Sequence, residues 1–166
     1  MEWIEFLNDP ELKAQSELYG MPTGENLCKK VIHDSLECLN TYKECAKIIS
    51  TLHNELSPQT RLWFTKWSPS IERWVSEINS LAKQCEELLT ESLAWANVIT
   101  QIGEVVEQAS VLEIESQAVA MPNTGVGRKM IQIALRAIEN LNLLRHDIIS
   151  HNYKRLWTIR KYGDSM

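Results

Sequence analysis

The residues of this sequence best suited to chemistry lie near its end. Arg145 is followed at once by a second polar residue, His146, and six positions later by His151. Arginine carries a permanent cation with several N–H donors, and histidine is the side chain that binds and releases a proton near neutral pH. Such a pair can act on a phosphodiester without a metal ion, because one side chain meets the phosphate charge while the other moves protons.

These residues fall in an amphipathic pattern that predicts a last helix over residues 128–161. Its stripe is apolar up to Leu141, and then places Arg145 and Asn152 on the buried face with His151 in the neighbouring row. Polar groups there either complete an internal hydrogen-bond network or line a cleft. Residues six apart on a straight helix differ by about 240° in direction. Arg145 and His151 are therefore expected to flank the stripe from opposite sides, unless the helix bends or a partner helix brings two copies together.

The rest of the chain also repeats with a helical period. A stripe from Cys28 to Leu56 predicts a helix near residues 25–56, and cap-plus-proline signals at Ser57–Pro58 and Ser68–Pro69 start new helices. Residues 69–119, read literally, form one long helix, and whether it breaks between Thr90 and Gly103 is left open.

The fold class predicted from these patterns is all-α: an antiparallel bundle of about four long helices with short N-terminal and connecting helices. We expect a single domain over residues 1–166. Its parts are short helices in 1–24, bundle helices in 25–120, a loop at 121–127 and the last helix.

The composition is that of a globular protein: 44% hydrophobic and 23% charged residues, with only 6 glycines and 5 prolines. No apolar run approaches the length that spans a membrane, and the acidic, amphipathic first residues do not resemble a secretory signal. These features predict a cytoplasmic protein without a membrane partner.

Charge is distributed unevenly along the chain. From Val126 onward, eight Lys/Arg face three acids, a balance of +5, whereas residues 1–125 carry −10. This basic segment, in which Lys154, Arg155, Arg160 and Lys161 continue the predicted helix past His151, could face phosphates. The alternative is that the last helix complements acidic neighbours inside the fold, and the sequence does not separate the two.

The four cysteines, Cys28, Cys38, Cys45 and Cys85, show no CxxC pattern, and the histidines are not spaced as zinc ligands. Cys38 and Cys45 lie about 10 Å apart along a helix axis, which is too far for a disulfide. We expect buried, reduced thiols and no metal site.

The motif in its helical context resembles the signature of the HEPN superfamily: an Arg, a polar residue directly after it, a His further on, and here His-Asn-Tyr at 151–153 in the last helix. The resemblance covers about 20 residues and the helical layout, and residues 1–125 add nothing to it. It implies a homodimer whose Arg and His residues form a metal-independent ribonuclease site without a cofactor. Arg145 would stabilise phosphate charge, His151 would act as general acid/base, His146 would be the accessory polar residue, and Asn152 would match the weaker tail.

The same resemblance implies an RNA substrate and a toxin–antitoxin or antiviral setting, with an antitoxin protein as a partner. The residues expected to contact the RNA are Asn152, Lys154, Arg155, Arg160 and Lys161. A rival interpretation from another class stays open. In it the chain is a non-catalytic helical interaction or scaffold protein, and Arg145 and His151 are structural polar residues of an internal network.

Overall fold

The computed structural model describes residues 3–11, 14, 24–88, 92–116 and 119–152. Regular structure in these residues is entirely helical, which confirms the predicted fold class. The helices are α1 (Trp3–Leu7), α3 (Gly24–Ser50), α4 (Pro58–Lys66), α5 (Ser68–Leu88), α6 (Ser92–Gln108), α7 (Val111–Ser116) and α8 (Gly125–Ile149). Within the described segments, no helix combines the length and the apolar character needed to cross a membrane.

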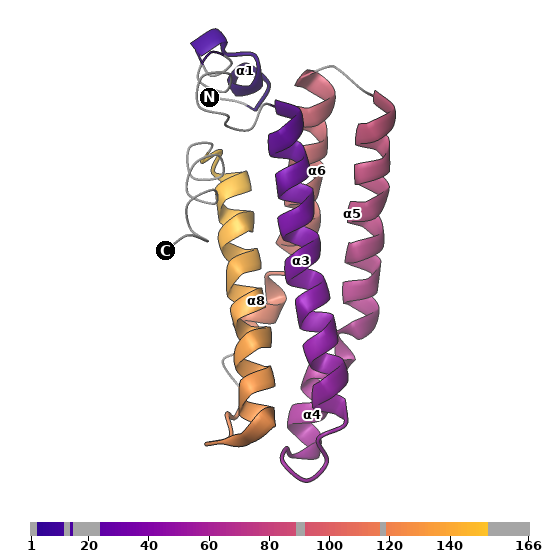
Figure 1. Ribbon diagram of the computed structural model, residues 1–166, viewed down its shortest axis with the longest axis vertical. Helices are drawn as coiled ribbons and strands as arrows, with labels where there is room; N and C mark the ends of the chain where they lie inside the picture. The colour runs from indigo at the N-terminus through magenta and orange to yellow at the C-terminus, as the bar shows by residue number, and fades with distance from the viewer. Residues whose placement is uncertain (1–2, 12–13, 15–23, 89–91, 117–118, 153–166) are drawn as a thin grey trace.

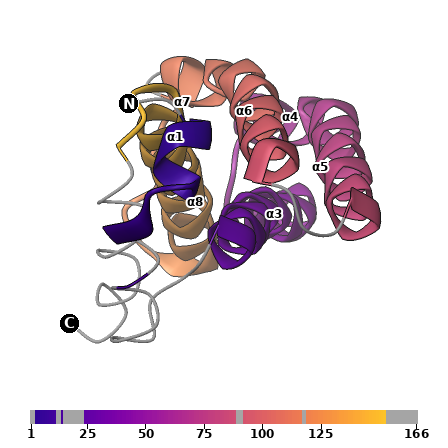
Figure 2. The ribbon, with the colours of Figure 1, turned by 90° about the horizontal axis from the view of Figure 1, so that it is seen from above.

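The four longest of these helices form an antiparallel bundle (Figure 1). α3 and α6 run one way, and α5 and α8 run the other. Seen along the bundle, α3 and α6 lie between α8 and α5, so that each packs against both (Figure 2). α1 lies across the end of the bundle where α8 finishes and α6 begins, and it packs against α6. That end carries the motif.

α3 is the central helix because its apolar stripe meets α8, α5 and α6 at once. Between Cys28 and Ile49 the stripe predicted from the sequence is buried except at Cys38, which is half-buried. Buried Ser35 donates its hydroxyl to the Val31 carbonyl at 2.7 Å. The predicted end at residue 56 is wrong. The hydroxyls of Ser50 and Thr51 donate to the carbonyls of Lys47 and Ile48. These side-chain bonds compete with the backbone hydrogen bonds that would continue the helix, and a turn follows.

The question that the sequence left open for residues 69–119 is answered by two breaks. α5 ends at Leu88 and α6 begins at Ser92, at the edge of the stretch of weaker helix formers, and a second break at Ala109 and Ser110 separates α6 from α7. Folding back lets α5 and α6 bury their stripes against each other and against α3. One straight helix of that length would leave much of its apolar seam without a partner.

The predicted Ser57 cap is present, since the Ser57 hydroxyl accepts from the Thr60 N–H at 3.2 Å. The loop expected at 121–127 is shorter, because α8 begins at Gly125, which adopts a φ of +94° that favours glycine. Thr124 makes no side-chain cap; instead the Glu55 carboxylate accepts from the Gly127 N–H at 3.4 Å. A carboxylate at a helix N-terminus also complements the helix dipole.

Candidate functional site

α8 ends at Ile149, two residues before the motif histidine, His151. Ser150 is its C-cap, and His151 follows with a φ of +55°, in the left-handed region. The His151 N–H donates to the Ile148 carbonyl at 3.3 Å, and the Asn152 N–H donates to the Asp147 carbonyl at 2.9 Å. These two bonds form a Schellman motif, with histidine at the position that glycine usually occupies. The predicted last helix is therefore interrupted after Ile149, and Asn152 is not part of its stripe. The part of the prediction that covers residues 153–161 lies outside the described residues.

Arg145 lies in the last turns of α8 and points to α6. Its Nε donates to the Asn142 Oδ1 at 2.9 Å, and its Nη1 lies 2.9 Å from the Glu107 Oε2. The guanidinium is thus held in a fixed direction by one neighbour on its own helix and one carboxylate on the next helix. Its side chain is 25% exposed, so it occupies the rim of the α6–α8 interface and not the core.

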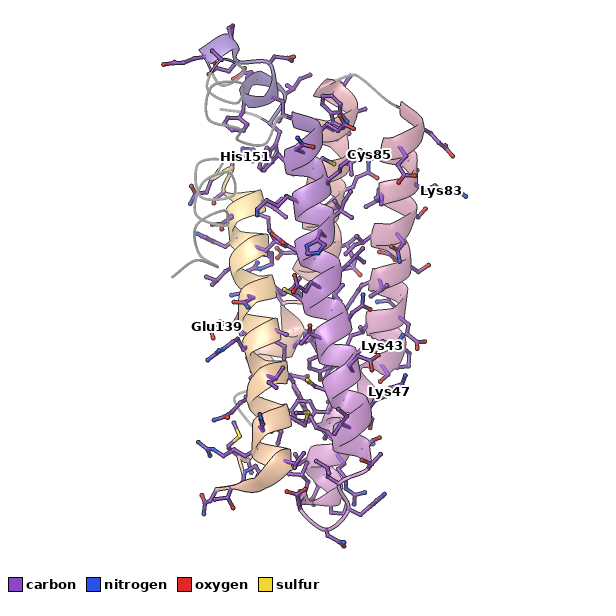
Figure 3. All side chains as sticks on the ribbon, in the orientation of Figure 1. Lys43, Lys47, Lys83, Cys85, Glu139 and His151 are labelled. Carbon is purple, nitrogen blue, oxygen red and sulfur yellow. The ribbon has the colours of Figure 1, made fainter. Side chains whose placement is uncertain are left out.

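His151 sits beside α1, at the end of the bundle (Figure 3). Its ring meets the ring of buried Trp3 edge to face, with centroids 5.8 Å apart. The imidazole lines a hollow of about 430 Å³ between α1, α6 and the end of α8. The other residues that line this hollow are Trp3, Thr100, Gly103, Glu104, Glu107, Ile148 and Ile149.

On a straight helix, the six-residue spacing would direct Arg145 and His151 to opposite sides. The end of α8 at Ile149 removes this restriction. Because His151 has left the helix, its side chain no longer follows the helical rotation, and it lines the hollow whose wall also includes residues of α6. Glu107 connects the two: it is the ion-pair partner of Arg145 and a wall of the hollow that His151 lines. One chain therefore gathers a cation, a carboxylate and an imidazole at one end of the α6–α8 pair.

The charge of this hollow matters for any anionic ligand. Glu104 and Glu107 both come from α6 and carry negative charge into the hollow. The positive charge of Arg145 balances that of Glu107. A phosphate at Arg145 must therefore compete with the Glu107 carboxylate for the same guanidinium. The rest of the lining is mostly apolar, so charges in the hollow interact more strongly than they would in open water.

The other residues that the sequence singled out are placed less centrally. His146 is exposed on α8, and its carbonyl accepts from both the Ser150 N–H and the Ser150 hydroxyl. Asn152 is half-buried and closes the helix cap through its N–H. The predicted phosphate contacts Lys154, Arg155, Arg160 and Lys161 lie outside the described residues.

Three residues of this region were missed by the sequence reasoning. The buried polar residue on the α8 stripe is Asp147, 2% exposed, and not Arg145. Asp147 follows the buried residues Leu141 and Leu144 in steps of three, and this spacing would have placed Asp147 on the buried face of α8. Glu107 and Trp3 gave no local signal, since they reach the site only through the packing of α6 and α1 against α8.

A second group of possible ligands lies on α3. Donor atoms of His33, Asp34 and Glu37 lie within 4.8 Å of one another, and His33 and Glu37 are exposed. All three belong to one solvated helix face, where such groupings are common without an ion. Comparison with known proteins adds no further assignment, because no family model, curated protein or solved structure matches the chain.

Proposed function

We propose that this protein is a HEPN-like, metal-independent RNA endonuclease whose active site is the Arg145–Glu107–His151 group at the end of the bundle. The observation that carries the proposal is the break after Ile149, which turns His151 onto the same α6 surface that Arg145 contacts. Glu107 and Arg145 lie on packed helices, and His151 is positioned by the cap of α8 and by Trp3, so that three groups of different chemistry come together as a site for phosphoryl transfer needs.

The reaction fits these groups one by one. A base takes the proton of a ribose 2′-hydroxyl, whose oxygen attacks the adjacent phosphorus; the 5′-oxygen leaves with a proton from an acid. The products are a 2′,3′-cyclic phosphate and a free 5′-hydroxyl. Glu107 is the carboxylate placed to act as base, His151 is the acid, and Arg145 meets the negative charge that grows on the phosphate oxygens.

Glu107 is the part of this assignment that the motif alone does not contain. Replacing it by glutamine keeps an oxygen for Arg145 but removes the base, so we expect the cleavage rate to fall about 10²-fold or more. Stability should change little, by about 0–1 kcal/mol, because the Arg145–Glu107 pair is 25% and 51% exposed. Rates on a fluorescent single-stranded RNA and thermal melting measure both effects.

Glu104→Gln is the matched control, since Glu104 lines the same hollow from the same helix. It should change the rate only a few-fold. An unchanged rate in Glu107→Gln would remove Glu107 from the chemistry, and equal losses in both variants would point to a general effect of charge.

The proposed active form is a two-fold homodimer. Ile149, 51% exposed, presents apolar surface at the end of α8, where it also borders the hollow. We expect light scattering to give a dimer at micromolar concentration and Ile149→Asp to give a folded monomer. Ile114→Asp on α7, where the side chain is 70% exposed, should leave the dimer intact. A wild-type monomer, or a dimer that survives Ile149→Asp, would contradict this form.

The second candidate function is a non-catalytic interaction protein. The contacts that favour it are those already made within the chain: Arg145 is bound to Glu107 and Asn142, and His151 rests on Trp3. In this case the two residues serve packing, the wild type cuts no RNA, and removing either of them lowers the melting temperature instead. The variants described in the Discussion separate the two functions.

A further inference from the structure

Two cysteines far apart in the sequence meet in the core. The Sγ atoms of Cys28 on α3 and Cys85 on α5 lie 3.6 Å apart, and the residues are 0% and 7% exposed. Their positions differ by 57 residues, so no spacing rule pointed to the pair. The pair that the sequence suggested examining, Cys38 and Cys45, shares a helix face, whereas this one bridges two helices.

The pair sits at a defined place in the bundle. α3 and α5 are antiparallel neighbours that α4 and its flanking turns connect at one end (Figure 1). Cys28 lies in the first turns of α3 and Cys85 in the last turn of α5, and therefore at the opposite, unconnected end. Cys85 and His151 lie toward the same end of the molecule (Figure 3).

We propose that Cys28 and Cys85 are an oxidisable pair that forms a disulfide linking α3 to α5 when the protein meets a low-molecular-weight disulfide. A disulfide needs its sulfur atoms at about 2.05 Å, so the atoms must approach by about 1.5 Å, a shift within reach of side-chain rotation. This inference does not depend on the proposed nuclease activity.

The oxidant in this thiol–disulfide exchange is the small disulfide, which is itself reduced to two thiols. The thiolate of Cys85, the less buried residue, attacks one sulfur of the oxidant and releases one small thiol. The thiolate of Cys28 then attacks the mixed disulfide at the Cys85 sulfur and releases the second small thiol. The two protons that the cysteines lose end on the two released small thiols, and the two electrons reduce the disulfide of the oxidant.

Burial sets the conditions under which this happens. Removal from solvent, and then the neighbouring Cys85, raise the pKa of the Cys28 thiol well above its ordinary value. Because the thiolate is the reacting form, the closed bundle oxidises slowly at neutral pH, and the rate rises with pH and with local opening of the chain. The thiols thus stay reduced unless oxidising conditions persist.

The test is refolding from urea in a glutathione redox buffer, which gives the oxidant access to both thiols. Intact mass should show the loss of two hydrogen atoms, and peptide mapping should join residue 28 to residue 85. Closing a loop of this length at the free end of the α3–α5 pair should raise the melting temperature on the order of 5–10 °C, and dithiothreitol should reverse the rise.

Variants decide which thiols react. Cys38→Ala/Cys45→Ala keeps only the proposed pair and should show the same crosslink and the same shift in melting temperature. Cys28→Ala should carry glutathione on Cys85 and show no such shift. A dominant crosslink through Cys38 or Cys45, no crosslink after refolding, or a Cys28–Cys85 crosslink that lowers the melting temperature would each overturn the proposal.

Discussion

Replacing His151 with asparagine is expected to reduce RNA cleavage by about 10²–10⁴-fold while the fold is retained. Asparagine tolerates the left-handed backbone that residue 151 adopts, so the Schellman cap at the end of α8 should persist. It cannot exchange a proton near neutral pH, so the acid of the proposed reaction is lost. Arg145→Ala should cause a comparable loss, because the guanidinium is what meets the phosphate charge.

Two further variants separate chemistry from packing. His151→Gly removes the left-handed strain and should stabilise the protein by about 0.5–1 kcal/mol while remaining inactive. His33→Asn changes an exposed histidine on α3 and should leave the rate unchanged. The measurement is the initial rate on single-stranded RNA beside the melting temperature of each variant. A stable His151→Asn protein with the wild-type rate would exclude His151 from catalysis.

The largest effect on stability is expected where Gly103 of α6 packs against Ile148 of α8. A Cβ placed on Gly103 would lie 2.7 Å from the Cγ2 atom of Ile148, a distance that real Cβ contacts do not reach. Gly103→Ala should therefore cost about 1–3 kcal/mol, although alanine is the better helix former. Ile148→Ala leaves a cavity beside the hollow, since Ile148 is 2% exposed, and should cost about 2–5 kcal/mol.

Combining the two changes tests the contact itself. The Ile148→Ala truncation removes the atom that the new methyl group would strike, so the double variant should lose at least about 1 kcal/mol less than the sum of the single variants. Urea unfolding gives all three values. Gln101→Ala, on the exposed face of α6, is the control and should be nearly neutral. Strict additivity would mean that Gly103 and Ile148 are not packed as described.

Features that depend on periodicity could be predicted from the sequence, whereas the ends of two helices could not. Apolar spacing identified the buried face of α3, and cap-plus-proline signals located the start of α4. The ends of α3 and α8 were misplaced because they depend on local bonds: hydroxyls of Ser50 and Thr51 in one case, a left-handed His151 in the other. Histidine at such a position carries no signal comparable to that of glycine.

The candidate site shows the same division. The motif residues Arg145 and His151 could be found from their types and spacing, but the straight-helix assumption placed them on opposite sides. Their common neighbour Glu107 lies 38 residues before Arg145 and meets it only because α6 packs along α8. Such a partner becomes visible only once the helices are assembled, as does the contact between Cys28 and Cys85.

The central claim is that Arg145, Glu107 and His151 cleave RNA by attack of the 2′-hydroxyl. The most direct measurement is mass spectrometry of the products of a short single-stranded RNA incubated with the protein in EDTA, beside the same RNA carrying one 2′-deoxynucleotide at the cleaved position. We expect 2′,3′-cyclic phosphate ends from the first RNA and no cleavage at the substituted position of the second. Intact RNA after long incubation with micromolar protein, or cleavage at the deoxynucleotide, would contradict the account.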